Sequence, residues 1–168
     1  MPRAPTAESK VGPFLGIDPG ANGGIAIVFH NCAPIVTPMP TTEFDIFSHL
    51  SGHITGTVAV IEWIHPAIFQ IGKLQMSKLY GSYMALRMAL TAAHIPFEDV
   101  RAEVWQQGIG IRKKKGEKQA KWKDRLRGKA QQLFPQLPIW NETLEKQRAI
   151  AYALLIAHYC KLKHTGTL

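Results

Sequence analysis

Two carboxylates, each at the end of an apolar run, could together hold a metal ion. Asp18 follows the run 14–17, and Glu62 follows the run 58–61. If both runs are neighbouring strands that end on the same side of a sheet, the carboxylates converge, and their repulsion favours a bound cation. Mg²⁺ suits such a site, and two ions about 3.5–4 Å apart can activate water and stabilise a leaving oxygen. The alternative is two unrelated strand-end acids, with Asp18 capping its own turn.

The residues after Asp18 predict a tight turn. Pro19, Gly20, Asn22, Gly23 and Gly24 favour a β-turn or hairpin. A backbone with so few side chains lets an anion or a metal ion approach closely. The turn therefore leaves the Asp18 carboxylate accessible to a charged ligand.

Periodicity predicts an α/β domain with a mixed five-stranded sheet and helices on both faces. Three strands come first as a meander, and helices and strands then alternate. We expect a disordered tail over 1–10, the domain over 11–162 and a tail over 163–168. The expected strands cover 11–18, 24–30, 35–37, 57–63 and 99–105; the expected helices cover 43–50, 73–93, 118–134 and 143–161. The first helix is capped by Thr42, with Phe44, Phe47 and Leu50 on one face, and Met84 and Met88 widen the apolar stripe of the second.

Composition favours a polyanionic partner. The 168 residues carry a formal net charge of +8, so nucleic acid comes first and an anionic membrane surface second. The two cysteines lack CxxC spacing, which suits a reducing compartment. The longest apolar run, 149–157, is too short to span a bilayer, and we see no secretory signal.

The positive charge is concentrated in one segment. Ten of the eighteen residues of 112–129 are basic and two are acidic. Such a segment can displace counterions from phosphates, so we expect DNA contact rather than only a solvated face. Trp105 and Trp122 either stack on bases or pack in the core. The residues expected to contact DNA are Arg112, Lys113, Lys114, Lys115, Lys118 and Lys121.

The motifs together resemble RuvC-type Holliday junction resolvases, which have the RNase H-like fold. The likeness is greatest to the bacterial, phage and chloroplast branch, and it runs from about Val11 to Tyr159. It rests on Gly16-Ile17-Asp18-Pro19-Gly20 with the glycines that follow, Val60-Ile61-Glu62, Gly81-Ser82-Tyr83, Ile95-Pro96 leading to Val104-Trp105, and the segment 153–159.

The resemblance implies a site of four acids, of which this chain has two. The first two match Asp18 and Glu62. The last two belong on the final helix, at Tyr152 and at Ala149 or Arg148, and none of these is acidic. Tyr152 either plugs the former metal site or belongs to the core.

Glu145 is the nearest acidic substitute on that helix. It lies one turn, about 6 Å, before Ala149 and would reach a metal if the helix is shifted. The alternative is a first-turn acid that interacts with the helix dipole. We carry Glu145 as a tentative catalytic residue.

The loop after Glu62 is expected to touch the junction. Related resolvases carry an apolar wedge here, and Ile68 and Phe69 are the candidates. The alternative is that Phe69 packs under the long helix that follows.

These observations favour a homodimeric, Mg²⁺- or Mn²⁺-dependent endonuclease acting on four-way DNA junctions. The expected compartment is the bacterial or phage-host cytoplasm, near the nucleoid, with an organelle as the other option. One alternative is a catalytically weak or inactive protein that binds branched DNA. The other is an actin-like phosphotransferase, because Asp-Pro-Gly with following glycines also resembles a phosphate loop of that group.

Overall fold

A five-stranded mixed sheet forms the centre of the protein. A computed structural model describes residues 12–52, 55–67 and 74–168. The strand order is β3-β2-β1-β4-β5. β2 pairs antiparallel with both β1 and β3, and β4 pairs parallel with both β1 and β5. The strands are β1 (Phe14–Asp18), β2 (Gly24–Val28), β3 (Ile35–Pro38), β4 (Val58–Glu62) and β5 (Phe97–Val100). The predicted mixed sheet is confirmed.

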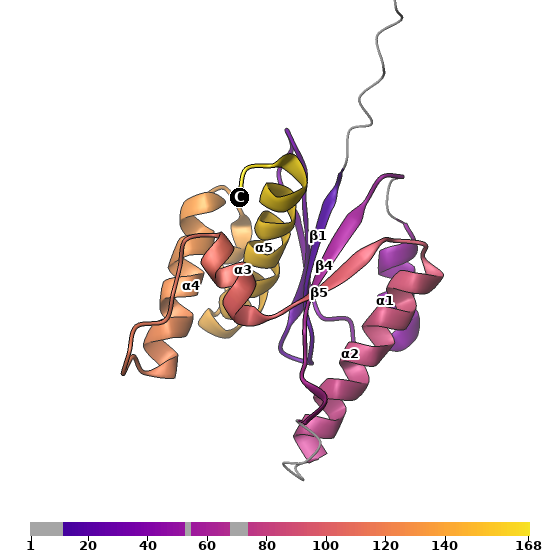
Figure 1. The fold of residues 1–168 in the computed structure, drawn as a ribbon, viewed down its shortest axis with the longest axis horizontal. Helices are drawn as coiled ribbons and strands as arrows, with labels where there is room; N and C mark the ends of the chain where they lie inside the picture. Colours follow the sequence, from indigo (N-terminus) through magenta and orange to yellow (C-terminus); the bar gives the residue numbers. More distant parts are fainter. Residues whose placement is uncertain (1–11, 53–54, 68–73) are drawn as a thin grey trace, which may run out of the picture.

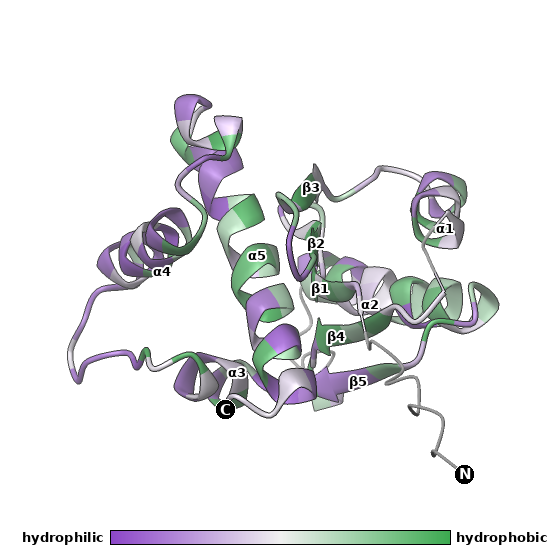
Figure 2. Ribbon diagram, turned by 90° about the horizontal axis from the view of Figure 1, so that it is seen from above, coloured by the Kyte–Doolittle hydropathy of each residue, from purple (hydrophilic) through white to green (hydrophobic). Residues whose placement is uncertain are grey.

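Helices cover both faces of this sheet. On one face lie α3, α4 and α5, and on the other lie α1 and α2 (Figures 1 and 2). The helices are α1 (Glu43–Ser51), α2 (Leu74–Ala92), α3 (Ala102–Gly108), α4 (Gln119–Leu133), a 3-10 turn at Pro138–Asn141, and α5 (Leu144–Thr165). None of the helices in the described residues is long and apolar enough to cross a membrane.

Alternation along β1 divides the core between the two faces. Leu15 and Ile17 pack with Leu86 and Leu90 of α2, whereas Phe14 packs with residues of α3, α4 and α5. Gly16 lies on the α5 face, where a Cβ would fall 2.1 Å from the Ala157 nitrogen and 2.4 Å from the Ala153 oxygen. The strand and the helix therefore meet backbone to backbone, and no larger residue fits at position 16.

Two predicted elements are wrong in part. The fifth strand ends at Val100 instead of 105, and residues 102–108 form α3, because burial of Trp105 in the core from a helix overrides its β propensity. Helix α5 continues to Thr165, so residues 163–165 are helical and not part of a tail.

The apolar face of α1 also differs from the prediction. Thr42 caps the helix, since its Oγ1 accepts the backbone N–H of Asp45 at 3.1 Å. The buried residues are Ile46 and Leu50, one turn apart, and Phe44 is 76% exposed. Met84 and Met88 of α2 are likewise exposed, so they widen a surface stripe and not the core.

Candidate functional site

Asp18 and Glu62 meet at one edge of the sheet, which we call the carboxylate edge. β1 and β4 are adjacent and parallel, and Ile17 pairs with Ile61, so the two acids end their strands at the same level. Burial raises the pKa of Asp18 well above its usual range, and the negative charge of Glu62 raises it further. The two acids therefore end neighbouring strands side by side and interact electrostatically.

The side chain of Glu62 is fixed by helix α3. The indole N–H of Trp105 donates to Oε2 of Glu62 at 2.8 Å. Burial raises the pKa of Glu62; the Trp105 hydrogen bond opposes this effect, and the charge of Glu103 adds to it. Trp105 thus orients the carboxylate, and its complete burial makes it a packing residue, so stacking on DNA bases is ruled out in this structure.

Tyr152 lies beside both acids, where the family resemblance places a carboxylate. Its ring meets Trp105 edge to face, with centroids 6.2 Å apart. Burial, followed by the charges of Asp18 and Glu62, raises the pKa of the phenol, so this group stays neutral at physiological pH. The side chain is partly buried and faces the site as well as the core. The position that would hold a third negative charge holds a neutral hydroxyl.

Two cations also reach this region. Lys123 of α4 lowers the pKa of Asp18, the smallest of the three influences on that group. Arg148, at another expected acidic position, donates to Oδ1 of Asp124 on α4 through Nη2 at 2.7 Å and Nε at 3.2 Å. Positive side chains therefore lie near the carboxylate edge where the resemblance calls for further acids.

The donor set fits one divalent cation better than two. Across residues 12–52, 55–67 and 74–168, no three His, Cys, Asp or Glu side chains lie close enough together to hold a metal ion. Glu145 is exposed in the first turn of α5 and does not join the two acids, and Ala149 offers no ligand. Two converging carboxylates still match the small protein ligand set that Mg²⁺ uses alongside water and phosphate oxygens.

A cleft of about 970 Å³ opens beside Asp18, large enough for one or more nucleotides. Its floor is the turn 19–23, and its walls come from the start of α1 and from α2, including Gln75, Lys78 and Ser82. The cleft adjoins Asp18 from the side of α1 and α2, and Glu62, Trp105 and Tyr152 are not among its lining residues.

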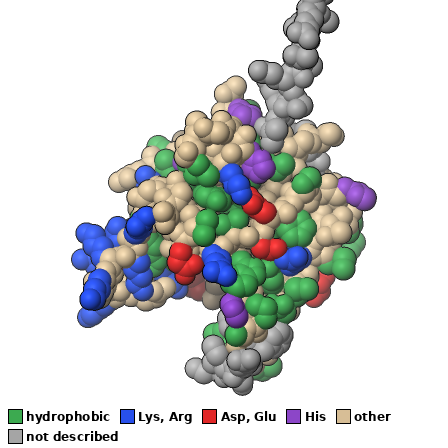
Figure 3. Space-filling model, in the orientation of Figure 1, with side chains coloured by type: hydrophobic (Ala, Val, Ile, Leu, Met, Phe, Trp, Pro, Cys, Tyr) green, Lys and Arg blue, Asp and Glu red, His purple; other side chains and the backbone are tan. Residues whose placement is uncertain are grey.

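The basic segment lies over α4 and the loop that precedes it, where Lys and Arg side chains gather (Figure 3). Its ten basic and two acidic residues give 10 − 2 = +8, which equals the net charge of the whole chain. Helix α4 buries Trp122, Leu126 and Ala130 against the core, which turns its charges outward. The six residues expected to contact DNA (Arg112, Lys113, Lys114, Lys115, Lys118 and Lys121) are all exposed.

The remaining residues are the wedge candidates, Trp122, and two residues of the site that the sequence did not predict. Ile68 and Phe69, the wedge candidates, lie outside the described residues. Sequence reasoning missed the Trp105–Glu62 hydrogen bond because Trp105 was assigned to a strand. It missed Lys123 because nothing in a run of lysines shows which one faces β1. Trp122 is 3% exposed, which favours the packing alternative.

Comparison with known proteins identifies the fold and no sequence family. No protein-family model matches the chain, and no curated protein matches it. Among solved structures, Thermus thermophilus RuvC in complex with a Holliday junction substrate is 14% identical, with a TM-score of 0.58. Another T. thermophilus RuvC structure is 15% identical, with a TM-score of 0.53. Both alignments cover 91% of this chain and 96% of the other. The protein therefore has a RuvC-like fold of the RNase H type.

Proposed function

We propose that this protein is a structure-selective endonuclease that binds four-way DNA junctions and hydrolyses a phosphodiester with a divalent cation. The observation that carries the proposal is the convergence of Asp18 and Glu62 beside a +8 segment. The RuvC-like fold supports the choice of branched DNA, because one of the matching structures is a complex with a Holliday junction.

Each group of residues has a distinct task in this proposal. The exposed lysines of the basic segment attract the phosphate backbone, which gives affinity without sequence preference. Lys123, near Asp18, draws a phosphate towards the carboxylate edge. Trp105 holds Glu62 in one orientation, and the Tyr152 hydroxyl can donate to or accept from a phosphate oxygen or a water.

The cation proposed is Mg²⁺ or Mn²⁺, held by Asp18 and Glu62. When bound, such an ion lowers the pKa of a water and offsets the charge of the phosphate. Burial is the main cause of the raised pKa of each acid, and the charge of Glu62 adds to it at Asp18; a bound cation would stabilise both ionised carboxylates.

A homodimer completes the proposal. A four-way junction has approximate two-fold symmetry, and a symmetric dimer presents two equivalent sites to it. Helix α2 exposes Leu74, Met84 and Met88, with 70%, 46% and 69% of their surface accessible. An apolar stripe of this kind supports pairing with a second copy.

The function is tested with an end-labelled four-way junction and a linear duplex built from the same strands. We expect the protein to bind the junction more tightly and to nick it in Mg²⁺ or Mn²⁺. Equal affinity for both DNAs would contradict junction selectivity. Binding without nicking at every concentration of either ion would contradict the nuclease assignment.

The second candidate is a protein that binds junctions without cutting them, and Tyr152 is the observation that favours it. A neutral phenol in place of a carboxylate removes one metal ligand, and Ala149 and Arg148 restore none. The same assay separates the two candidates, because this one predicts selective binding with no metal-dependent product.

A further inference from the structure

The lysines at the start of the basic segment lie on a formed turn. The backbone N–H of Glu117 donates to the carbonyl oxygen of Lys114 at 3.0 Å, which closes a four-residue turn. Gly116 has a φ of +76°, the conformation that the third position of a type II turn requires and that glycine adopts without strain. We call residues 113–117 the lysine turn.

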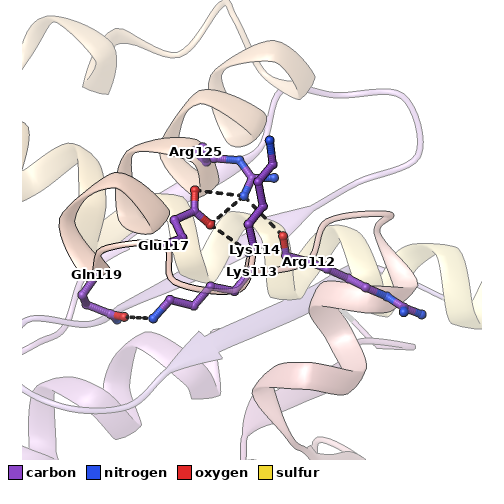
Figure 4. Close-up of polar contacts among 6 residues, drawn as sticks. All are labelled: Arg112, Lys113, Lys114, Glu117, Gln119 and Arg125. Carbon is purple, nitrogen blue, oxygen red and sulfur yellow. Dashed lines mark hydrogen bonds and ion pairs between the residues drawn. The ribbon is translucent and has the colours of Figure 1, made fainter.

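Glu117 ties this turn to helix α4 (Figure 4). Its carboxylate accepts the backbone N–H of Lys114 at 3.0 Å and Nη1 of Arg125 at 2.8 and 3.1 Å. Arg125 also donates to the carbonyl oxygen of Arg112 at 3.3 Å. The Glu117 side chain is only 3% exposed although it belongs to a surface loop.

A further contact connects the turn to the helix, and one connects the helix to the core. Nζ of Lys113 donates to Oε1 of Gln119 at 2.8 Å, on the first residue of α4. The guanidinium of Arg125 lies 5.2 Å from the ring centre of the buried Trp122. The turn is therefore held in place from both ends, and the side chains of Lys114 and Lys115 take no part in these contacts.

An acid among ten basic residues has an electrostatic disadvantage for DNA binding, which its structural role explains. Burial favours the neutral form, yet the Lys114 N–H and the Arg125 cation together keep the pKa of Glu117 below its usual value. Within the described residues, Lys114, Lys115, Lys118 and Lys121 have no acid within ion-pair distance. The Glu117 carboxylate is therefore engaged mainly by Arg125 and the Lys114 backbone; the Lys114 charge also lowers its pKa, whereas Lys115, Lys118 and Lys121 face no acid in the described part of the chain.

We propose that Glu117 and Arg125 are positioning residues that hold the lysine turn as a preformed clamp for neighbouring phosphates of one DNA strand. This inference rests on the proposed function in taking DNA as the ligand. A preformed clamp loses less conformational entropy on binding than a flexible lysine loop, and its shape selects among backbone paths. Junction selectivity, and not only affinity, should then depend on the carboxylate of Glu117.

The test uses a variant for which charge and positioning predict opposite changes in DNA affinity. Glu117→Gln removes a negative charge from the basic segment, so charge alone predicts tighter binding to all DNA. Positioning predicts weaker junction binding, by about twofold to tenfold, the range for one lost hydrogen bond. The salt dependence of binding should stay unchanged, because every lysine remains. The matched control is Glu142→Gln, which makes the same change in an exposed ion pair with Lys146.

A second variant perturbs the turn without changing charge. A Cβ at Gly116 meets no atom within 4 Å, so the main effect of Gly116→Val is the strain of a β-branched residue at this positive φ. Gly128→Ala, in α4 with equally open space, is its control. We expect Gly116→Val, and not Gly128→Ala, to reduce the ratio of junction to duplex affinity, with the melting temperature as a check on folding.

The outcomes separate this inference from the proposed function. If the wild-type protein fails to bind the junction, both are overturned. If the wild type binds selectively while Glu117→Gln and Gly116→Val keep the same selectivity, the positioning role is overturned and the function stands. Faster hydrogen exchange at the Lys114 amide in Glu117→Gln would locate the effect in the turn.

Discussion

The carboxylate edge and the lysine turn both place like charges close together, but they do so in opposite ways. At the edge, strand register places Asp18 beside Glu62, and burial raises the pKa of both acids, with the charge of Glu62 adding to the effect at Asp18. In the turn, exposed lysines are spread by a backbone that one acid and one arginine hold. The charge of the edge therefore suits a cation, and the charge of the turn suits an anion.

This difference also separates what the two regions contribute. Water screens the exposed lysines, so their effect on binding is summed over several phosphates and falls with salt. The edge depends on two carboxylates in fixed positions. A single substitution there should therefore change the rate of strand cleavage while leaving DNA affinity nearly intact.

The largest effect is expected from Asp18→Asn on strand cleavage. Loss of one of only two carboxylates should reduce metal-dependent nicking by at least about 100-fold, whereas junction affinity should change little. Single-turnover nicking and a gel-shift titration of the same junction measure both. Glu145→Gln is the matched control and should cut within about twofold of wild type, since Glu145 stands apart from the edge. Wild-type nicking by Asp18→Asn would remove the edge from the mechanism.

The next effect is expected from replacing Lys113, Lys114 and Lys115 together with alanine. Loss of three phosphate contacts should lower the slope of log affinity against log salt by about 2.7, or 0.9 per contact. The measurement is fluorescence anisotropy across a series of salt concentrations. Lys146→Ala, outside the basic segment, should leave the slope unchanged. An unchanged slope in the triple variant would mean that the lysine turn does not touch DNA.

Tyr152→Asp should strengthen cation binding at the edge. A third carboxylate beside Asp18 and Glu62 is expected to tighten Mn²⁺ binding roughly tenfold, with faster nicking as the second readout. Calorimetric titration with MnCl₂ measures the Mn²⁺ affinity. Tyr152→Phe keeps the ring contact with Trp105 and serves as the control that adds no ligand. Equal Mn²⁺ affinity in both variants would show that position 152 lies too far from the ion.

The smallest effect is on stability without metal. The folded-state pKa of Asp18 is raised, so its ionised form destabilises the protein at high pH and not at low pH. Asp18→Asn should therefore melt higher than wild type at pH 8, by about 2–4 °C for each kcal/mol that the buried Asp18 charge costs. The difference should vanish as the pH falls below about 4, where Asp18 is protonated in both states. A lower melting temperature at pH 8 would show that the ionised Asp18 side chain stabilises the fold, contrary to this prediction.

Much of this arrangement could be predicted from local pattern. The continuous apolar runs of β1 and β4, each closed by an acid, led to the carboxylate edge once the strands were taken as neighbours. The boundaries of α4 and the exposure of its lysines followed from composition and periodicity. In these regions, local preference and the final fold agree.

The parts that could not be predicted depend on contacts distant in sequence. Trp105 has strand propensity but lies in α3, because its indole both fills the core and reaches Glu62, 43 residues away. Lys123 is one lysine among many until α4 is placed on α5. Glu117 resembles any surface acid in the sequence, since its role depends on Arg125 and the turn.

The contact at Gly16 bears on how cutting activity could be gained. Ala153 and Ala157 of α5 rest directly on the β1 backbone, so the helix cannot slide along the sheet without a clash. A slide of about 10 Å, some two turns, would be needed to bring Glu145 to the place of Tyr152. This packing therefore prevents Glu145 from reaching the carboxylate edge through a shift of α5. A descendant or a designed variant would recover further acids only by point substitution at positions 148, 149 or 152.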